Sequence, residues 1–487
     1  MKIELAPTHR TCWQIAILVA IAALLFASTY NNTRKTSTKQ NSINTRTYLD
    51  ATLTAKIAYL LSTIPSQKGQ TATDSQMLHR AISSHEKMMA DSTTHGTILR
   101  LAILQRILKQ GDVNETLCKM HSTIPAADRT KWTYPKSPDE EIIVWSKILN
   151  LDKAVPVPEA QKVIQKAGLG WYAYPLLAKI YLSHGDNAGY ARENWRAISG
   201  TLMVFAFFFI GGLLALIGVG IAGVSARHFY ISYKHPDIPL PSYLQSSTLH
   251  TVSSPVSDAL YNAFLLFLLG FLLVRLAGPA LLPSLGLADG KDTIVQNLLV
   301  NIVFTLISAS LPAFYLHAIA KNIDFKISDI GLHIRDFGKN ITWGFLGYLA
   351  ALPIIWLVAF FSSILFRHFD TPDNPAIIMF ASSHGIARLL LFIEAAVMAP
   401  LLEETIFRGI FLRSLMPRMR PVLAIVVCSA VFAILHPQLP IGFAAIFVLG
   451  ALFSILSLHR NSLVPGIVAH AVNNGAIMLM LFLMVGD

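Results

Sequence analysis

Eight apolar runs follow one another from residue 198 to the end of the chain, and they constrain the fold more than any other feature of the sequence. A helix needs about 20 apolar residues to cross a bilayer, and in lipid only helices and closed barrels satisfy all backbone polar groups. The runs therefore predict an all-α, polytopic transmembrane helix bundle of about eight spans, although two of the runs are somewhat short. They lie near residues 198–224, 258–283, 294–319, 341–366, 385–406, 421–436, 441–458 and 463–485.

The composition agrees with a membrane protein that also carries soluble mass. Only 14% of the 487 residues are charged, whereas about 25% is typical of soluble domains. The net charge of +11 does not indicate nucleic-acid binding, because no basic stripe with interleaved aromatic residues accompanies it. The three cysteines, Cys12, Cys118 and Cys428, lie far apart and form neither a disulfide framework nor a C-x-x-C metal motif.

The N-terminal segment, residues 1–30, contains a further apolar run from Thr11 to Tyr30 that follows Lys2 and Arg10. This arrangement is typical of a membrane anchor, but its apolar centre is also short enough for a cleavable signal segment. We favour the anchor. In either case the chain that follows is predicted to leave the cytoplasm.

Residues 31–197 are predicted to form an extramembrane all-α domain, because charges are frequent and no apolar run is long enough to span a bilayer. Two stretches, Ile107–Asp112 and Tyr181–Asp186, each end an amphipathic helix with Gly-Asp. Their offset of 74 residues (181 minus 107) is about two units of a helical-hairpin repeat. The hypothesis is a small array of helical hairpins, and the alternative is two ordinary glycine caps.

Lys and Arg are distributed unevenly among the connections between the apolar runs. Segments 225–257, 320–340 and 407–420 each hold at least two of them, and 459–462 holds one. Because cytoplasmic loops carry an excess of positive charge, these segments are predicted to face the cytoplasm and residues 31–197 the opposite side. We therefore expect an integral protein of a bacterial inner (plasma) membrane with an extracytoplasmic helical domain.

Three polar clusters interrupt the apolar background of the last third of the chain. They are Glu403-Glu404-x-x-x-Arg408, Phe432-x-x-x-His436 and His470-x-x-x-Asn474. A carboxylate near the bilayer centre costs roughly 3 kcal/mol on insertion scales, so two adjacent ones predict a polar cavity inside the bundle. On a helix Arg408 neutralises Glu404 at i, i+4 and leaves Glu403 free to act as a general acid or base. The alternative is a purely structural ion pair within the membrane.

The spacing of the first two clusters predicts that they lie at one depth. Pro417 and Pro421 bracket a predicted cytoplasmic turn; Glu403 lies 14 residues before the first proline and His436 lies 15 residues after the second. At about 1.5 Å per residue both side chains lie roughly 21–23 Å from the turn, within reach of a shared water. His470 lies only about 10 Å into its own run. It reaches the others only if the connection before it sits below the membrane surface.

Two chemistries suit these residues. In the first, Glu403 and His436 activate a water by taking its proton. His470 and Asn474, which share one helix face, then donate hydrogen bonds to an oxyanion, unless Asn474 instead orients the imidazole. In the second, Glu403, His436 and His470 bind Zn²⁺ and leave one coordination position for water. The chain contains no H-E-x-x-H motif, so no cofactor is predicted and zinc stays an alternative.

The three clusters, in this order, resemble the CPBP family of intramembrane proteases, which is also called the Abi or CAAX-protease family. Flanking residues add to the resemblance, namely Asp329-Ile330-Gly331-Leu332, Ala399-Pro400, Phe407-Arg408-Gly409 and Arg460-Asn461-Ser462-Leu463-Val464-Pro465. The resemblance covers roughly residues 325–485. Residues 321–487 are therefore expected to form the protease core, preceded by the transmembrane helices of residues 198–320.

The resemblance implies an all-α membrane core with endopeptidase activity, as in the enzymes that trim the last three residues from prenylated CAAX proteins. By motif position the implied catalytic residues are Glu403, Glu404, Arg408, His436, His470 and Asn474. Family members have been described both as metalloproteases and as glutamate-dependent proteases. The implied partners are membrane lipid and a protein or peptide substrate, which is lipidated in the CAAX case.

Residues 31–197 do not resemble the usual family architecture, and they support a second hypothesis. A non-catalytic membrane scaffold or bacteriocin-immunity protein would bind a protein partner through this region, with the polar clusters serving stability. A third hypothesis is a transporter that uses the polar cavity as a proton path. It is weakly supported, because no inverted repeat is evident in the sequence.

Overall fold

Helices dominate the computed structural model of the protein. The described residues form helices and their connections without a strand, which confirms the predicted all-α class. The predicted N-terminal anchor or signal segment, residues 1–30, lies outside the described residues. The structure describes residues 45–63, 72–91, 93–122, 138–240, 252–284, 293–366, 379–380, 385–436 and 438–485.

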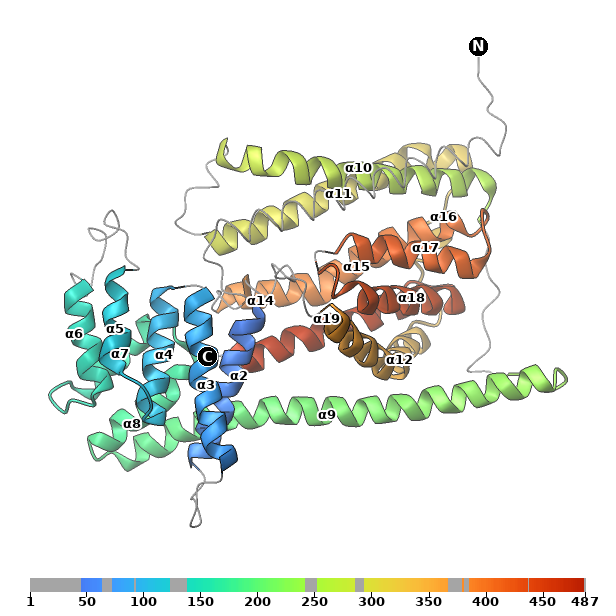
Figure 1. Ribbon diagram of the computed structural model, residues 1–487. Helices are drawn as coiled ribbons and strands as arrows, with labels where there is room; N and C mark the ends of the chain where they lie inside the picture. The colour runs from blue at the N-terminus through green and yellow to red at the C-terminus, as the bar shows by residue number, and fades with distance from the viewer. Residues whose placement is uncertain are drawn as a thin grey trace. The chain divides into compact units, whose positions relative to one another are not determined.

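The elements form two groups along the chain (Figure 1). The first comprises α2 (Thr45–Thr63), α3 (Ala72–Asp91), α4 (His95–Leu108), α5 (Val113–Cys118), η1 (Lys119–Ser122), α6 (Pro138–Leu149), α7 (Val157–Lys166), η3 (Gly170–Tyr172) and α8 (Ala173–Ser183). The second comprises α9 (Asn187–Lys234), α10 (Ser254–Ser284), α11 (Thr293–Ile323), η4 (Ile327–Ile330), α12 (Phe337–Leu365), α14 (Ile386–Ile393), η5 (Glu394–Met398), α15 (Ala399–Glu404), η6 (Thr405–Leu412), α16 (Arg413–Leu415), α17 (Pro421–Ile434), α18 (Phe443–Arg460) and α19 (Val464–Val485).

The chain divides into two compact units. Unit 1 contains the described residues from Gly211 to Met478, and unit 2 contains those from Thr45 to Ile210 together with the last turns of α19. Helices α9 and α19 each continue from one unit into the other. The boundary suggested by the sequence at residue 197 therefore falls inside α9, because no proline separates the polar first turns of this helix from its apolar part.

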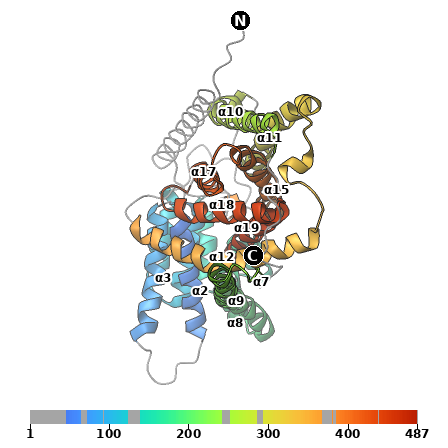
Figure 2. The same ribbon diagram turned by 90° about the vertical axis from the view of Figure 1, so that its right-hand side faces the viewer.

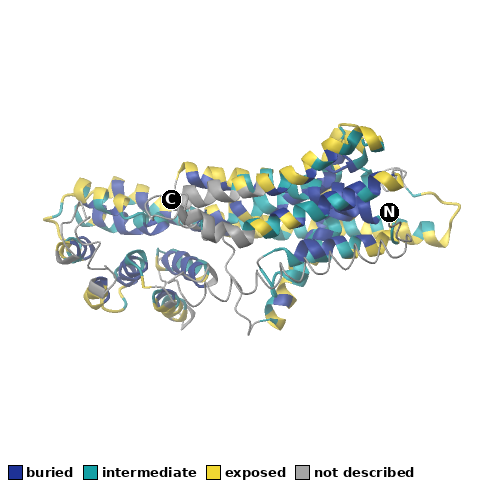
Figure 3. Ribbon diagram, turned by 90° about the horizontal axis from the view of Figure 1, so that it is seen from above, coloured by how far each residue is buried: buried dark blue, intermediate teal, exposed yellow. Residues whose placement is uncertain are grey.

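Unit 2 is built from short helices packed around one apolar core. Figures 1 and 2 show α2 and α3 side by side, and Figure 3 shows buried and exposed residues alternating along the helices. Leu101 of α4, Trp145 of α6 and Leu176 of α8 are among the buried core residues. Helices α4 to α8 have 14 residues or fewer and would be marginal alone in water, so this shared core holds the unit together.

The two Gly-Asp stretches both follow the end of a helix, but they end it differently. Lys109 (φ 56°) is the left-handed residue that ends α4, with Gly111 (φ 82°) beyond it, whereas Gly185 (φ 79°) takes this conformation directly after the cap of α8. Asp112 then accepts hydrogen bonds from N–H groups at the start of α5. Asp186 accepts one from Gly189 at the start of α9. Whether these caps belong to a repeated helical hairpin stays a hypothesis.

His85 of α3 is a buried histidine in unit 2. Its Nδ1 donates to the Ala81 carbonyl at 2.8 Å, because a carbonyl can only accept, and its Nε2 therefore accepts from the Tyr172 hydroxyl at 2.7 Å. Burial lowers the pKa of His85 to about 4, to which Arg100 also contributes, while the Ala81 carbonyl and Asp50 oppose the decrease. Folded His85 is thus neutral at a pH where the unfolded chain is protonated.

We predict that the stability of unit 2 falls as the pH is lowered from about 6.5 toward 4. In that window the unfolded chain binds a proton that folded His85 does not, so the free energy of unfolding decreases by up to about 1.4 kcal/mol per pH unit. Pulse proteolysis of the full chain in lipid nanodiscs measures this slope. His85→Gln should flatten it, whereas His79→Gln, at an exposed position of the same helix, should not. Equal slopes in all three proteins would contradict the prediction.

Each of the eight apolar runs contains a helix. Five helices in the described part of the chain are long and apolar enough to cross a membrane, namely α9, α10, α12, α18 and α19. Fewer helices pass this criterion than the eight spans expected. Helix α17 is apolar but only 14 residues long, and the run at 385–406 is divided by the π-helical segments η5 and η6.

Close contacts place α12 against its neighbours in unit 1. Pro353 has no N–H, which leaves the Leu349 carbonyl of α12 without its helical donor. Gly218 of α9 lies against this carbonyl, where a Cβ would come within 1.9 Å of the oxygen. Gly344 and Gly347 make similarly close contacts with α19 and α18. Small residues allow membrane helices to approach closely, and here they fix α12 beside the helices of the polar clusters.

Aromatic packing fixes the helix that carries the adjacent glutamates. The Phe264 ring of α10 stacks on the Phe411 ring of η6 with centroids 3.8 Å apart. The Phe407 ring meets the Phe264 ring edge to face at 5.7 Å. These rings belong to a buried cluster that joins α10, η6 and α17, so the glutamates project from a rigid support.

Candidate active site

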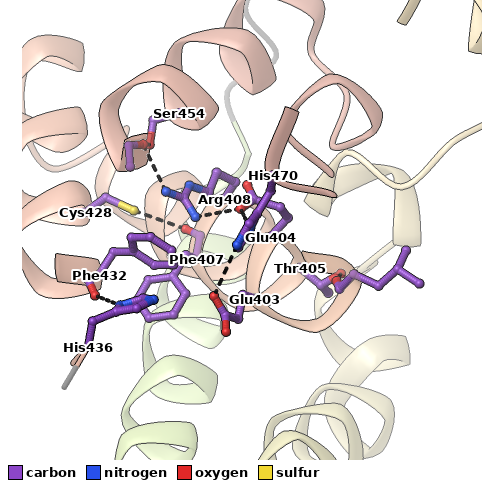
Figure 4. A network of polar contacts seen from close by, with 12 residues as sticks. Glu403, Glu404, Thr405, Phe407, Arg408, Cys428, Phe432, His436, Ser454 and His470 are labelled. Carbon is purple, nitrogen blue, oxygen red and sulfur yellow. Dashed lines mark hydrogen bonds and ion pairs between the residues drawn. The ribbon is translucent and has the colours of Figure 1, made fainter. Parts of the chain in front are cut away.

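The adjacent glutamates lie on α15, between the two π-helical segments. Glu404 and Arg408 are fully buried, at 0% exposure, and Arg408 Nη1 donates to Glu404 Oε1 at 2.9 Å (Figure 4). The ion pair expected from the i, i+4 spacing is therefore present. A buried charge left without its partner is costly, so each member of the pair requires the other.

Arg408 contacts α17, which carries the second cluster, and α18. Its Nη2 donates to the Gly450 carbonyl of α18 at 3.0 Å. Its guanidinium lies 4.4 Å from the Phe432 ring centroid of α17 and 5.2 Å from that of Phe453 of α18. A guanidinium can stack on aromatic faces while it donates in its own plane, and Arg408 does both.

His470 joins the third cluster to the first. Its Nδ1 lies 2.9 Å from Glu404 Oε1 (Figure 4). The structure brings His470 to Glu404, and the connection before α19 is itself buried in the protein. Ser462 and Leu463 have 0% exposure, and Leu463 N donates to the Gly331 carbonyl at 3.0 Å. Helix α19 thus begins inside the protein.

Helix α19 approaches Glu404 closely at Gly466. A Cβ there would lie 2.9 Å from Glu404 Oε2. The His470 ring stacks on the Phe453 ring with centroids 4.8 Å apart, which fixes the plane of the imidazole. Gly466 was not identified from the sequence as part of the site. The spacing could have indicated it, because a residue four positions before His470 lies on the same helix face.

Glu403 has a different environment from its neighbour. Its side chain is 35% exposed, and its Oε2 has no hydrogen-bond partner among the described residues. His470 Nε2 lies 3.9 Å from this oxygen, which is beyond hydrogen-bond range. The two carboxylates therefore differ in exposure and in their bonds: Glu404 is fully buried and its Oε1 is bonded by Arg408 and His470, although its Oε2, like that of Glu403, has no hydrogen-bond partner among the described residues.

His436 follows the end of α17. Its Nδ1 donates to the Phe432 carbonyl at 2.7 Å, so Nε2 is the acceptor of the neutral ring. The Phe432 ring contacts both histidines, with centroid distances of 4.5 Å to His436 and 6.0 Å to His470. Glu403 is also close enough to His436 for an electrostatic interaction. The structure thus brings the second cluster to the first and third.

Asn474 does not orient the His470 imidazole, which was one of the two roles considered for it. Its Nδ2 donates instead to the Ala395 carbonyl of η5 at 2.9 Å. Hydrogen bonds in a π-helix skip five residues, and five residues after Ala395 stands Pro400, which has no N–H. The carbonyl therefore lacks a helical donor, and Asn474 supplies one.

Two hydrogen-bonding residues beside the site were missed from the sequence. Asn473 Nδ2 donates to Asn474 Oδ1 at 3.1 Å, and the Tyr348 hydroxyl of α12 donates to Asn473 Oδ1 at 3.3 Å. The two consecutive asparagines in the sequence could have indicated Asn473. Nothing in the sequence indicated Tyr348, because its contact depends on how α12 packs. A third carboxylate, Glu394 of η5, interacts electrostatically with Glu403 and was also missed.

The zinc alternative finds no preassembled set of ligands in the structure. The part of the chain that the structure describes contains no group of three or more His, Cys, Asp or Glu side chains that could hold a metal ion. The Nδ1 contacts of His470 and His436, to Glu404 and to a backbone carbonyl, leave Nε2 of each ring available.

Comparison with known proteins gives one family match. Residues 385–476 match the family model described as "Type II CAAX prenyl endopeptidase Rce1-like". No match to the chain was found among curated proteins or among solved structures. The matched segment contains all three polar clusters, and the apolar helices around it make the chain an integral membrane protein. Residues 385–476 therefore belong to the CPBP family of CAAX-type intramembrane proteases.

Proposed function

We propose that the chain is an intramembrane endopeptidase that hydrolyses a peptide bond of a membrane-associated protein or peptide by activating water. The observation that carries this proposal is the contrast between the two adjacent carboxylates. Glu404 is fully buried, and its Oε1 is bonded by both Arg408 and His470, whereas Glu403 is 35% exposed and its nearest cationic partner, His470 Nε2, lies 3.9 Å away. Oε2 lacks a hydrogen-bond partner in both side chains, so the contrast lies in exposure and in the bonds to Glu404 Oε1. The family match supports the protease class.

In the proposed first step Glu403 Oε2 accepts a proton from water while the water oxygen attacks the carbonyl carbon of the scissile bond. His436 Nε2 accepts a hydrogen bond from the same water and orients it. The tautomer that leaves Nε2 free is supported by the bond from Nδ1 to the Phe432 carbonyl. The product of this step is a tetrahedral oxyanion and a protonated Glu403.

In the proposed second step the oxyanion accepts hydrogen bonds from His470 Nε2–H and from the N–H of Asn474 that does not bond Ala395. His470 fills this role as the imidazolium, because its Nδ1–H already donates to Glu404 Oε1. The C–N bond then breaks, and the leaving amine takes the proton from Glu403. This restores the carboxylate and completes the hydrolysis.

The substrate class that we propose is the C-terminal segment of a prenylated protein, and the alternative is a membrane-bound peptide that is matured by cleavage. The family description supports the first class. A prenyl group would hold the substrate in the bilayer beside the exposed apolar residues of the bundle. We further propose that residues 31–197 recruit a substrate or protein partner outside the cytoplasm.

The proposed function is tested with the full chain in proteoliposomes. Two peptides of one sequence are supplied, one with a farnesylated cysteine followed by three residues and one without the lipid, and mass spectrometry identifies the products. We expect loss of the last three residues from the farnesylated peptide. Equal cleavage of both would contradict prenyl recognition. Cleavage of neither peptide, nor of membrane proteins reconstituted beside the chain, would contradict the proposed function.

Metal removal should leave this activity unchanged. The described residues offer no group of side chains suited to hold a metal ion, and the proposed steps require none. The assay is repeated after dialysis against EDTA and 1,10-phenanthroline, with metal content measured in parallel. Loss of activity that Zn²⁺ restores would contradict the proposed water activation by Glu403.

A further inference from the structure

A one-way chain of hydrogen bonds leads from α12 to the proposed oxyanion site. It consists of the Tyr348 hydroxyl, the Asn473 amide, the Asn474 amide and the Ala395 carbonyl, joined at 3.3, 3.1 and 2.9 Å. Tyr348 and Asn473 are both buried. Buried polar groups that lose their partners cost about 1–3 kcal/mol each, so this chain has a strongly preferred arrangement.

The Ala395 carbonyl determines the direction of the chain. The Ala399 N–H, which would serve this carbonyl in an α-helix, bonds Glu394 O instead, and Pro400 has no N–H to offer. The carbonyl is left as a pure acceptor, so Asn474 must turn its NH₂ group toward it. A π-helical turn such as η5 contains one residue more than an α-helical turn, and Pro400 follows it. Together they leave the Ala395 carbonyl as an acceptor in a fixed position beside the site.

The same constraint passes outward through the side chains. With its NH₂ group on Ala395, Asn474 must present Oδ1 to Asn473, which must therefore donate through Nδ2. Asn473 Oδ1 then faces Tyr348, whose hydroxyl donates. If the Asn474 amide flipped, its oxygen would face the Ala395 oxygen, and Asn473 would oppose it with a second donor.

We infer that Tyr348 and Asn473 are positioning residues that hold the Asn474 amide in the one orientation in which its second N–H can donate to a substrate oxyanion. This inference rests on the proposed function of the site. A flipped Asn474 would present an oxygen to the developing negative charge and would oppose the reaction. Neither positioning residue is required to touch the substrate.

The test is a double-mutant cycle on peptide cleavage. Asn474→Ala should lower kcat by about 10²–10³-fold, the usual cost of removing one oxyanion donor. Tyr348→Phe should lower kcat by about 3- to 10-fold, as expected for loss of one hydrogen bond, with KM changed less than twofold. In the Asn474→Ala background, Tyr348→Phe should have no further effect, because there is no amide left to orient.

A second variant removes the donor in the middle of the chain. Asn473→Asp keeps the shape but has no NH₂ group, so it should lower kcat by about 10- to 100-fold and should also lose its effect in the Asn474→Ala background. Tyr315→Phe is the matched control, because its hydroxyl pairs with Asn262 in another part of unit 1. It should leave kcat and KM unchanged.

The outcomes separate this inference from the proposed function. If the wild-type protein cleaves no substrate, the proposed function fails before the positioning residues are tested. If the wild-type protein is active and Asn474→Ala is impaired, but Tyr348→Phe and Asn473→Asp lower kcat equally in both backgrounds, the residues act on stability alone and the inference is wrong. Wild-type kcat in Asn473→Asp would also overturn it.

Discussion

Replacing Glu403 with glutamine should reduce kcat for peptide cleavage by roughly 10²–10⁴-fold, which is the usual contribution of a general base. Glutamine keeps the size and shape of the side chain but cannot take a proton from water. The substitution should change the unfolding temperature little, because Glu403 Oε2 makes no hydrogen bond and its ion pair with His470 Nε2 is long, at 3.9 Å. Cleavage rates and thermal unfolding of the same preparations in nanodiscs measure both effects.

Glu394→Gln is the matched control for this variant. Glu394 is a second carboxylate near Glu403, on the π-helical segment that precedes α15. Its neutralisation changes the local charge by the same amount without removing the proposed base, so kcat should fall less than about tenfold. Equal losses in the two variants would show that the net charge of the site matters and that Glu403 has no special role.

Replacing Arg408 with methionine should destabilise the protein by about 3–5 kcal/mol, the usual cost of leaving a buried charge without its partner. Methionine fills much of the space between Phe432 and Phe453 but cannot donate to Glu404 or to the Gly450 carbonyl. The expected result is a large decrease in the unfolding midpoint, together with loss of activity. Equilibrium unfolding in mixed micelles measures this effect.

Two further variants show whether the loss comes from the unpaired charge. The double variant Glu404→Gln with Arg408→Met removes both charges and should recover part of the stability, although not the activity. Arg420→Met changes the same residue type at an exposed position before α17 and should alter stability by less than about 0.5 kcal/mol. An Arg408→Met protein as stable as the wild type would rule out a structural role for the ion pair.

Local patterns in the sequence predicted those parts of the site that depend on one helix. The Glu404–Arg408 ion pair follows from i, i+4 spacing on any helix, and the structure contains it. Glu403 points about 100° away from Glu404 around the helix axis. It was therefore expected to lie outside the ion pair with Arg408. The extracytoplasmic placement of residues 31–197 and the membrane anchor at residues 1–30 stay predictions, since no membrane is present and residues 1–30 lie outside the described residues.

Contacts that depend on helix register were not predictable in the same way. His470 meets Glu404 because the connection before α19 is buried under Gly331, and a count along the apolar run cannot show that burial. Asn474 bonds the Ala395 carbonyl because, in the π-helical segment, the N–H that would serve this carbonyl belongs to position 400, and Pro400 has none. The proline can be read from the sequence, but the π-helical turn can be seen only in the backbone of the structure.

The amino-acid sequence by itself determined that this chain is a bundle of membrane helices with two adjacent carboxylates, because apolar length and the 3.6-residue period act within single segments. Only the tertiary structure decided which other side chains meet the Glu404–Arg408 pair and Asn474. Those contacts depend on the close approach of α19 at Gly466, the stacking of Phe432 and Phe453 around Arg408, and the packing of α12 beside Asn473. Such contacts arise between segments far apart in the chain, where no local period sets the distance.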